Sequence, residues 1–315
     1  HEITAGIQSS YKKYLNGFSP NYSGTYRFNS LADFYAAADG KQPAGLYNLS
    51  YALGGGSFPL VGPRNFEAGI FIQDKYRATD KLTVTYGIRA DYTNFYNTFL
   101  FNPVVDTITR FYNGIRANTG AQPNTAIQIS PRIGFTYNVD EDKTLVIRGG
   151  SGVFTGRIPF AWLGYAYYND GVGYGSYDKN NLTAAQVAAA GDPLTPNGLN
   201  GYHDATPKVQ ADLIDNKFKM PAVLRNSLAI DKIINGYKFT TEGMYTKVIR
   251  DLEFQQVNKM DNPTYFSYDT KHEMPIYAAN INSAFSNAYL LSNTNKGYRY
   301  SITEMISKTY DFGLN

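Results

Sequence analysis

Few residues in this 315-residue chain have the types and spacing that catalysis or metal binding requires. His203 and His272 each precede an acidic residue, Asp204 and Glu273, but neither pair has the spacing of metal ligands on a helix. The chain contains no cysteine, which excludes thiolate catalysis and cysteine-ligated zinc. We therefore expect the histidines, His1 among them, to lie on loop surfaces, and we predict no metal, no cofactor and no catalytic residue.

Serine nucleophiles and phosphate-binding loops are not indicated either. No serine lies in a nucleophile-elbow motif, and the glycines of residues 171–175 lack the preceding strand and following helix that a phosphate-binding loop needs. Asp170, Asp178 and Asp204 could pair in space, as the carboxylates of a glycoside hydrolase do, although their spacing does not require it. A secreted β-rich carbohydrate-binding or hydrolytic domain therefore stays open as an alternative function.

Tyrosine is the most informative residue type. The chain has 28 Tyr, 19 Phe and 1 Trp, and its 17% of charged residues falls below the roughly 25% of soluble domains. Tyrosine has an apolar body and a polar tip, which suits a membrane boundary or an extracellular binding surface. Five aromatic residues of one long loop predict an extracellular platform that stacks against sugars or peptides: Phe160, Trp162, Tyr165, Tyr167 and Tyr168. The alternative is that they pack against neighbouring loops or form an aromatic girdle.

Charge and hydropathy exclude two classes of protein. The net charge is only +3 and no basic stripe is present, which argues against nucleic-acid binding. No apolar run reaches the roughly 18 to 20 residues of a membrane-spanning helix, a limit that does not apply to a membrane β-barrel. The chain opens at His1 in a predicted strand without an initiating methionine, so we expect any signal peptide to lie outside it and the chain to be a mature fragment.

The clearest pattern has a period of two residues, which indicates strands with one apolar face. From Leu82 to Tyr92 every second residue is apolar or aromatic, and the intervening residues are Thr, Gly, Arg and Asp. A polar turn at residues 78–81 joins this strand to a similar one at residues 67–75, which predicts a hairpin. The apolar face includes Ile70, Val84 and Ile88.

The same design recurs along the chain. Asp140–Lys143 is the predicted turn of a second hairpin, and Asn235-Gly236, the strongest short hairpin-turn dipeptide, joins a third. Strands are also predicted at both ends of the chain, at residues 2–8 and 297–308. In the last strand Glu304 falls on the apolar face, which is tolerated near the headgroup region of a membrane.

Tight turns alternate strictly with very long connections. The long segments, far longer than loops in compact domains, span residues 11–65, 93–126, 157–221 and 251–296. Short turns on one side and long loops on the other are typical of a transmembrane β-barrel, and so are tyrosines near strand ends. A soluble sandwich or propeller also alternates, but these features together predict an all-β, antiparallel transmembrane barrel with about eight strands in this chain.

Short helices are expected within the long loops. Ser30 can cap a helix over residues 31–38 that ends at Gly40, and Thr183 can cap an alanine-rich turn or two. Thr206-Pro207 can open another helix.

Several sequence segments resemble TonB-dependent outer-membrane receptors, and in particular their Oar-like group. Residues 69–76 (GIFIQDKY) and 80–91 (DKLTVTYGIRAD) resemble the barrel hairpin of these receptors. Residues 130–135 (SPRIGF), 147–154 (IRGGSGVF) and 289–294 (YLLSNT) with Gly297-Tyr298 resemble the Oar-like group. The likeness covers nearly the whole chain.

The resemblance implies a barrel of roughly 22 strands around a plug domain, in the outer membrane of a Gram-negative bacterium. It implies import of scarce nutrients, with TonB acting through the plug, and contacts with outer-membrane lipid and with a surface lipoprotein. The chain departs from the pattern because it has no plug-like domain and no TonB-interacting segment. We therefore expect residues 1–315 to be one segment of a receptor barrel wall, an open sheet that acts in transport and not as an enzyme.

Charged residues of the polar strand face are the predicted lumen- or plug-facing set: Arg89, Asp91, Arg132, Arg148 and Arg225. Counting back from the turn at Asp140–Lys143 puts Arg148 near Gly134, so Arg132 and Arg148 should be diagonal neighbours on one face. Because their hairpin has no inward carboxylate close by, we expect both to contact a plug or another segment outside this chain. The alternative is that water and loop carbonyls satisfy both.

Overall fold

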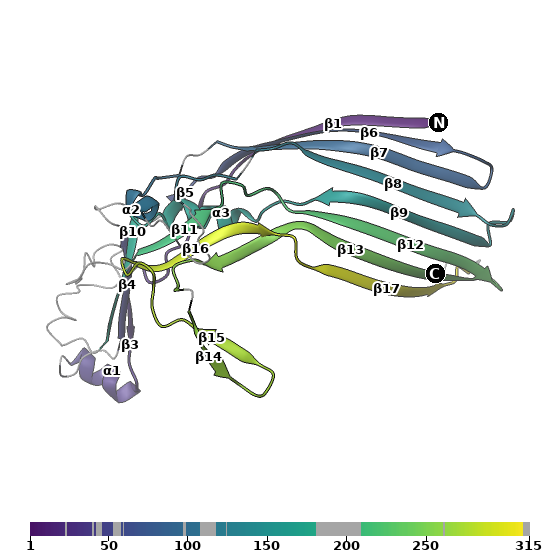
Figure 1. Cartoon of the computed structure of the whole chain (residues 1–315). Helices are drawn as coiled ribbons and strands as arrows, with labels where there is room; N and C mark the ends of the chain where they lie inside the picture. The colour runs from purple at the N-terminus through teal and green to yellow at the C-terminus, as the bar shows by residue number, and fades with distance from the viewer. Residues whose placement is uncertain are drawn as a thin grey trace.

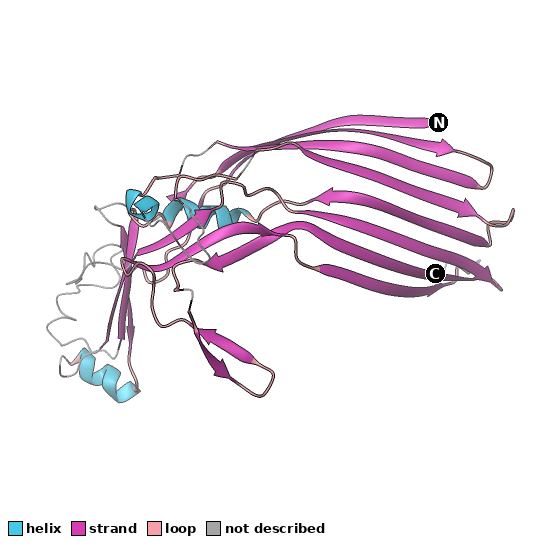
Figure 2. Ribbon diagram, in the orientation of Figure 1, coloured by secondary structure: helices cyan, strands magenta, loops and turns pink. Residues whose placement is uncertain are grey.

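The structure of the protein is a computed structural model of the chain (Figures 1 and 2). Its dominant element is one large sheet. The sheet has ten strands in the order β1-β6-β7-β8-β9-β12-β13-β16-β11, with β17 paired to β13. The structure describes residues 1–22, 24–39, 41, 46–52, 58, 60–96, 99–107, 118–123, 125–180, 209–260 and 262–310.

Long antiparallel strands make up most of this sheet. They lie side by side, with the short turns at one end and the long connections at the other (Figure 1). Their bounds are β1 (Glu2–Lys13), β6 (Arg64–Arg77), β7 (Leu82–Phe95), β8 (Gln128–Asn138), β9 (Leu145–Thr155), β12 (Ala222–Ile234), β13 (Tyr237–Gln256) and β17 (Tyr298–Ser307). The three hairpins predicted from the sequence are confirmed.

The turns follow from their residues. Asn235 and Gly236 both have positive φ, 51° and 75°, the conformation of a type I′ hairpin turn that matches the twist of the flanking strands. The β8–β9 turn is longer than predicted, because the backbone N–H of Val139 donates to the carbonyl of Leu145 and leaves residues 140–144 in the turn. The Asp140 carboxylate closes this turn by accepting from the backbone N–H of Thr144 at 2.6 Å.

The 20-residue strand β13 has two partners on one edge. Its first half pairs with β17 and its second half with β16 (Phe285–Thr294), and both pairings are antiparallel. Lys247 lies opposite Tyr298 and Asp251 opposite Thr294, which is one register, so β16 and β17 are two halves of one interrupted strand. The interruption contains Gly297, whose φ of 116° disfavours any residue with a side chain.

The sheet is open. Within the described residues β1 pairs only with β6, β17 pairs only with β13, and no pairing joins β1 to β17. The free long edge of β16 is covered by β11 (Val209–Ile214), which runs parallel to it. The structure therefore agrees with the predicted open sheet and shows no closed barrel.

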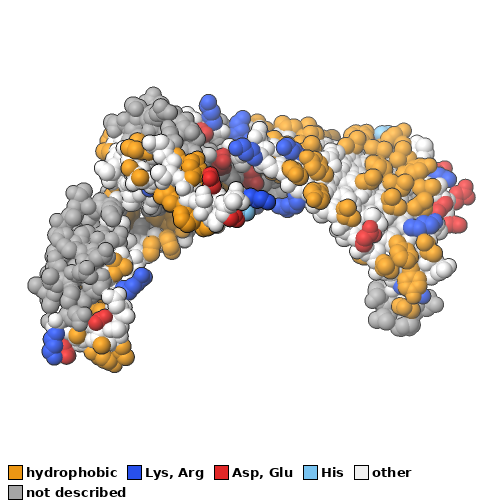
Figure 3. All heavy atoms as spheres, turned by 60° about the horizontal axis from the view of Figure 1, so that its bottom comes forward, with side chains coloured by type: hydrophobic (Ala, Val, Ile, Leu, Met, Phe, Trp, Pro, Cys, Tyr) orange, Lys and Arg blue, Asp and Glu red, His pale blue; other side chains and the backbone are white. Residues whose placement is uncertain are grey.

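The two faces of the sheet differ in chemistry. One, here called the apolar face, carries large aliphatic side chains that remain exposed even on interior strands: 61% for Ile70, 48% for Ile88 and 57% for Ile133. Figure 3 shows hydrophobic side chains gathered over the part of the sheet near the short turns, with charged side chains at its tip. The other, here called the polar face, carries the alternate residues of the same strands, most of them charged, hydroxylic or glycine.

The long connections fold into a second part of the protein, here called the loop assembly, which is joined to the large sheet through β16 and lies at the end opposite the short turns (Figure 1). It contains β11, β16 and the following elements: β2 (Asn16–Gly17), β3 (Thr25–Arg27), α1 (Leu31–Ala38), β4 (Leu46–Ala52), β5 (Leu60–Val61), α2 (Pro103–Thr107), α3 (Phe160–Tyr168), β10 (Tyr174–Asn180), β14 (Thr264–Ser267) and β15 (Glu273–Ile276). No helix in the described part of the chain is long and apolar enough to cross a membrane.

The predicted helix at residues 31–38 is confirmed as α1, and the Ser30 hydroxyl caps it by accepting from the Asp33 N–H at 3.1 Å. Gly40 and the helices expected after Thr183 and Thr206 lie outside the described residues. Helix α3 was not expected, because Pro159 at its N-cap offers no side-chain hydrogen bond and only burial of its apolar residues favours it.

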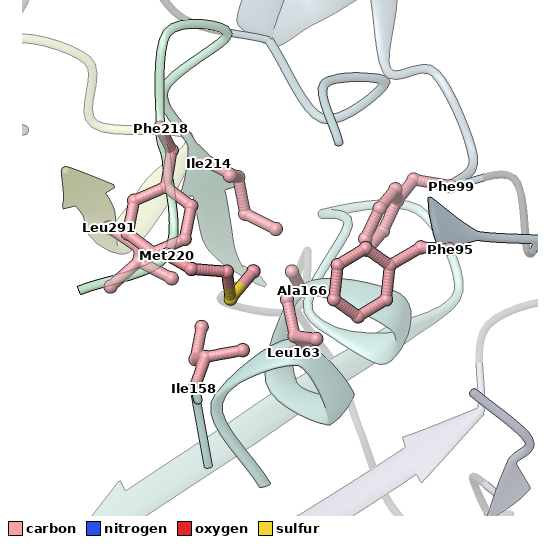
Figure 4. Close-up of a cluster of buried hydrophobic side chains, with 9 residues drawn as sticks. All are labelled: Phe95, Phe99, Ile158, Leu163, Ala166, Ile214, Phe218, Met220 and Leu291. Carbon is pink, nitrogen blue, oxygen red and sulfur yellow. The ribbon is translucent and has the colours of Figure 1, made fainter. Parts of the chain in front are cut away.

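The buried core of the protein lies in the loop assembly and where it meets the strand ends. One cluster joins α3 to β11, β16 and the ends of the wall strands; Figure 4 shows it: Phe95, Phe99, Ile158, Leu163, Ala166, Ile214, Phe218, Met220 and Leu291. A second cluster is built around Phe285 and Leu290 of β16, with Val105 and Val257. The apolar face of the long strands does not contribute to these two clusters, because among the described residues its large side chains stay exposed.

Candidate functional site

All five charged residues predicted to face a lumen lie on the polar face. The strand registers place them there, since Arg89 pairs with Ser130, Arg148 with Ala229 and Arg225 with Gly152. On its own strand or a neighbouring one, each of these partners occupies a position that alternates with the exposed isoleucines. Each therefore belongs to the face opposite to those isoleucines. A sheet with charged side chains on one face and apolar side chains on the other separates a water- or protein-filled side from a lipid side.

Arg89 and Asp91 form a close ion pair on this face. Arg89 Nε donates to both carboxylate oxygens of Asp91, at 2.8 and 2.9 Å, and Arg89 Nη2 lies 2.7 Å from Oδ1 of the same carboxylate. Both side chains cross the strand at Gly69, where a Cβ would lie 2.3 Å from the Arg89 guanidinium and 2.6 Å from the Asp91 carboxylate. The glycine therefore gives the pair its space. These several contacts with one carboxylate fix the orientation of the arginine, which a single contact would not do.

Arg148 is partnered within the chain, which corrects the expectation that it needs a plug or another segment. Its Nε lies 3.2 Å from Oδ2 of Asp231 on β12, and its Nη2 lies 3.8 Å from Glu242 on β13. Asp231 also accepts a 2.6 Å hydrogen bond from the Thr240 hydroxyl. Three strands thus share one charged cluster.

The predicted neighbourhood of Arg132 and Arg148 is wrong. Arg148 lies opposite Thr136, two residues from Gly134. The β8–β9 turn has five residues rather than four, which accounts for one of these two positions. Arg132 lies opposite Gly152, four residues farther along the strands, so the two arginines are not diagonal neighbours.

Arg132 finds an aromatic partner that the sequence reasoning missed. Its guanidinium lies over the ring of Phe154 at 4.4 Å from the centroid, and Arg225 approaches the same ring at 5.6 Å. No ion pair of either arginine is seen among the described residues. Phe154 lies six residues from Arg148 on β9, and side chains an even number of residues apart on a strand share a face. This spacing was the signal in the sequence that could have predicted the contact of Phe154 with an arginine.

A polar cavity of about 340 Å³ opens on this face next to the loop assembly. Glu67 lies at its wall, where one carboxylate oxygen accepts from Lys12 at 2.8 Å and lies 2.7 Å from Nη2 of Arg157. Residues of both charge signs line it, including Gln8, Glu67, Arg89, Asp91, Arg132 and Arg157. Its walls are therefore suited to a polar polypeptide surface or to water, and not to an apolar ligand.

The five aromatic residues predicted as a platform separate into two groups on α3. Phe160 stacks on Tyr14 at 4.1 Å, Trp162 lies 5.7 Å from Phe254, and Tyr167 stacks on Phe99 at 4.1 Å, in each case between ring centroids. All three pack against the core cluster of the loop assembly, and burial raises the pKa of Tyr167 to about 12. These three rings serve packing, as the alternative interpretation proposed.

Tyr165 and Tyr168 lie instead at a cavity of about 380 Å³, here called the tyrosine pocket. Its described lining also contains Phe18, Ser50, Asn169, Tyr174, Ser176, Gln210, Ser286 and Asn287. Tyr165 meets Phe18 edge to face at 5.9 Å and Tyr168 at 5.5 Å. Tyr168 itself is buried, and burial together with the neighbouring Tyr165 raises its pKa.

A buried carboxylate outside the described lining holds two of the side chains that line this pocket. Asp212 on β11 accepts from the side-chain amides of Asn169 and Gln210, the latter at 3.0 Å, while its backbone N–H donates to the Asn169 carbonyl at 2.8 Å. Burial raises the pKa of Asp212 to about 6, although these hydrogen bonds act in the opposite direction. Asp212 could not be predicted from the sequence, because β11 and α3 meet only through tertiary packing.

Hydrolytic or metal chemistry finds no support in the described residues. Asp170 is buried and its carboxylate accepts from the backbone N–H groups of Val172 and Gly173, so it holds a turn. His272 contacts Asp269 within an exposed turn. The described part of the chain has no group of three or more His, Asp or Glu residues that could hold a metal ion. His203 and Asp204 lie outside it, and the side chain of Asp178 is not described.

Comparisons with known proteins agree with this architecture. No curated protein matches the chain. The solved structure of the FrpB iron transporter from Neisseria meningitidis (F5-1 variant) is similar, with a TM-score of 0.41 at 12% identity over 96% of this chain, which spans 30% of that transporter chain. The family of outer membrane beta barrel domains matches residues 1–299. The chain therefore belongs to the outer membrane β-barrel domain family, and its place is the outer membrane.

Proposed function

We propose that the chain forms part of the wall of an import barrel of the TonB-dependent receptor type. In this proposal the apolar face meets lipid, the polar face borders the lumen and its plug, and the loop assembly receives a scarce nutrient at the cell surface. The observation that carries it is the difference between the two faces of one open sheet. One face carries exposed isoleucines, and the other carries ion pairs.

The open edges support a larger barrel. Backbone groups in a membrane must be hydrogen-bonded within the protein, so edges of β1 and β17 that pair with nothing in the described part of the chain favour further strands of the same barrel. A wall of roughly 22 strands in all would leave a lumen wide enough for a plug domain. The polar cavity near Glu67 and Arg89 offers both charge signs to such a plug.

The alternative of a secreted carbohydrate-binding or hydrolytic domain fits the apolar face poorly. Soluble monomers rarely expose contiguous apolar patches beyond a few hundred Å². Here isoleucines of neighbouring strands, among them Ile70, Ile88 and Ile133, form one continuous exposed surface.

Spin labels can test which side each face meets. Because the chain has no native cysteine, Ile88→Cys and Thr85→Cys each provide one nitroxide site within it in the full-length protein. Oxygen dissolves in hydrocarbon and a nickel chelate stays in water. We expect the label at position 88 to be relaxed mainly by oxygen, and the label at 85 to lack this preference. Equal accessibility ratios at both positions would contradict the assignment.

The transport part needs a separate test in cells. Deleting the whole gene should abolish growth on at least one limiting nutrient in a defined panel, and deleting the inner-membrane TonB protein should have the same effect on that nutrient. Growth that depends on the gene but not on TonB would contradict energised import.

A further inference from the structure

The tyrosine pocket is notable for the absence of charge from its described lining. Tyrosine, serine, asparagine and glutamine dominate its walls, and no Asp, Glu, Lys, Arg or His among the described residues lines it. A ferric complex, an acidic group or a free peptide terminus would need a countercharge there. The lining therefore favours a neutral ligand with many hydrogen-bonding groups.

The amides of the pocket are oriented by bonds on their far sides. Asn169 and Gln210 each direct their side-chain NH₂ group to the Asp212 carboxylate, which when ionised has acceptors only. Their carbonyl oxygens are thereby left as acceptors. Asn287 is turned the other way, because its oxygen accepts from Gln256 Nε2 at 2.7 Å and its NH₂ group is left as a donor.

A hydroxyl group suits this arrangement because it both donates and accepts a hydrogen bond. The aromatic rings add an apolar surface, since Tyr165 is only partly buried and Phe18, at the same pocket, is 51% exposed. A ligand that combines several hydroxyl groups with a flat C–H surface satisfies both features. Sugars have this combination, and about 380 Å³ accommodates one or two hexose units.

We propose that the tyrosine pocket binds a neutral saccharide, with its C–H face against Tyr165 and its hydroxyl groups bonded to Asn169 and Asn287. Asp212 acts as a positioning residue, because it fixes the two acceptor amides without reaching the ligand. The proposal deepens the proposed function by naming a ligand class, and it rests on that function only for the claim that the pocket faces the cell exterior.

Binding can be measured on the full-length protein in detergent. The probes are neutral gluco-, manno- and galacto-oligosaccharides of two to six units, compared by calorimetry with uronic-acid oligosaccharides and short peptides. We expect saturable binding of at least one neutral oligosaccharide. Tyr165→Ala should weaken it about three- to tenfold, the effect of losing one aromatic contact. Tyr265→Ala, which removes an exposed tyrosine of β14 outside the pocket, is the matched control and should change nothing.

A second variant covers the case in which Tyr165→Ala disturbs folding. Asn287→Asp keeps the oxygen that accepts from Gln256 but replaces the donor with a carboxylate, so affinity for the same oligosaccharide should fall. The proposal is overturned if no neutral oligosaccharide binds up to about 10 mM, if acidic sugars or peptides bind better, or if both variants bind like the parent protein. If no saccharide binds but the spin label at position 88 is in lipid, the saccharide proposal is wrong and the proposed function still stands.

Discussion

Arg148 on β9 and Asp231 on β12 are joined across neighbouring strands, with 3.2 Å between Arg148 Nε and Asp231 Oδ2. Lys238 of β13 approaches the same carboxylate at 3.7 Å, and the Thr240 hydroxyl donates to it at 2.6 Å. Asp231 is only 8% exposed, whereas Arg148 is half-buried, so the carboxylate is the centre of the cluster. One aspartate thereby ties three consecutive strands on the polar face.

Removing this centre should cost stability. Asp231→Ala leaves Arg148 and Thr240 without their acceptor, and we expect a loss of about 1 to 3 kcal/mol in unfolding free energy. Urea unfolding of the full-length protein in detergent or vesicles measures it. Glu242→Gln is the control: its 3.8 Å contact with Arg148 is long and partly exposed, so the change should stay below about 1 kcal/mol. Equal losses of unfolding free energy in the two variants would show that Asp231 is not the centre of the cluster.

Lipid contact predicts a contrast between two residues of β7. Ile88→Arg places a charge on the apolar face and should cost about 2 to 4 kcal/mol if position 88 lies near the bilayer midplane. Thr85→Arg points to the polar face and should be mild. Folding of the full-length variants into lipid vesicles, followed by gel mobility without heating, measures both. Equal tolerance of arginine at the two positions would reverse the facing assignment.

Glycines on the strands should differ in their tolerance of a methyl group. A Cβ on Gly87 would lie 2.7 Å from the backbone oxygen of Ile72, which no side-chain rotation relieves, so Gly87→Ala should cost about 1 to 3 kcal/mol. Gly243→Ala is the matched control, because the nearest atom to its Cβ is 4.0 Å away. The same urea titration compares them. Comparable midpoints would show that the strands shift to admit the methyl group.

Asp212 predicts the direction of a pH dependence in the loop assembly. Its pKa is about 6 in the folded protein and near 3.8 when unfolded, so the folded state holds the proton more tightly. Its contribution to stability is therefore complete at low pH and declines as the pH rises through the window from about 4 to 6, by roughly 2 to 3 kcal/mol. Asp212→Asn should lack this decline. Thermal unfolding of both proteins at pH 4, 5, 6 and 7 checks it, and parallel profiles would contradict it.

The strands were predictable because their information is local. Alternation assigns each side chain to a face, and Asn235-Gly236 or Ser30 announce a turn or a cap within a few residues. Register was less predictable: the Asp140 side chain closes a five-residue turn, and one added residue displaced the expected neighbour of Arg148.

The loop assembly was not predictable in the same way, because its pairings join distant segments. Residues 174–180 of β10 pair with residues 46–52 of β4, and β11 lies parallel to β16, without any turn between them to mark the pairing. The aromatic residues of α3 could be proposed as one set from composition. Only their neighbours distinguish Tyr167, stacked on Phe99, from Tyr165 at the pocket.

The interruption at Gly297 has a mechanical consequence. Strand β13 runs without a break from the wall into the loop assembly, while its partner strand is divided between β17 and β16 (Figure 1). A continuous strand resists bending, and a glycine with a φ of 116° between β16 and β17 lets the chain change direction there. We expect β13 to stiffen the connection between the wall and the loop assembly, and Gly297 to be the position on its edge at which the partner strand bends.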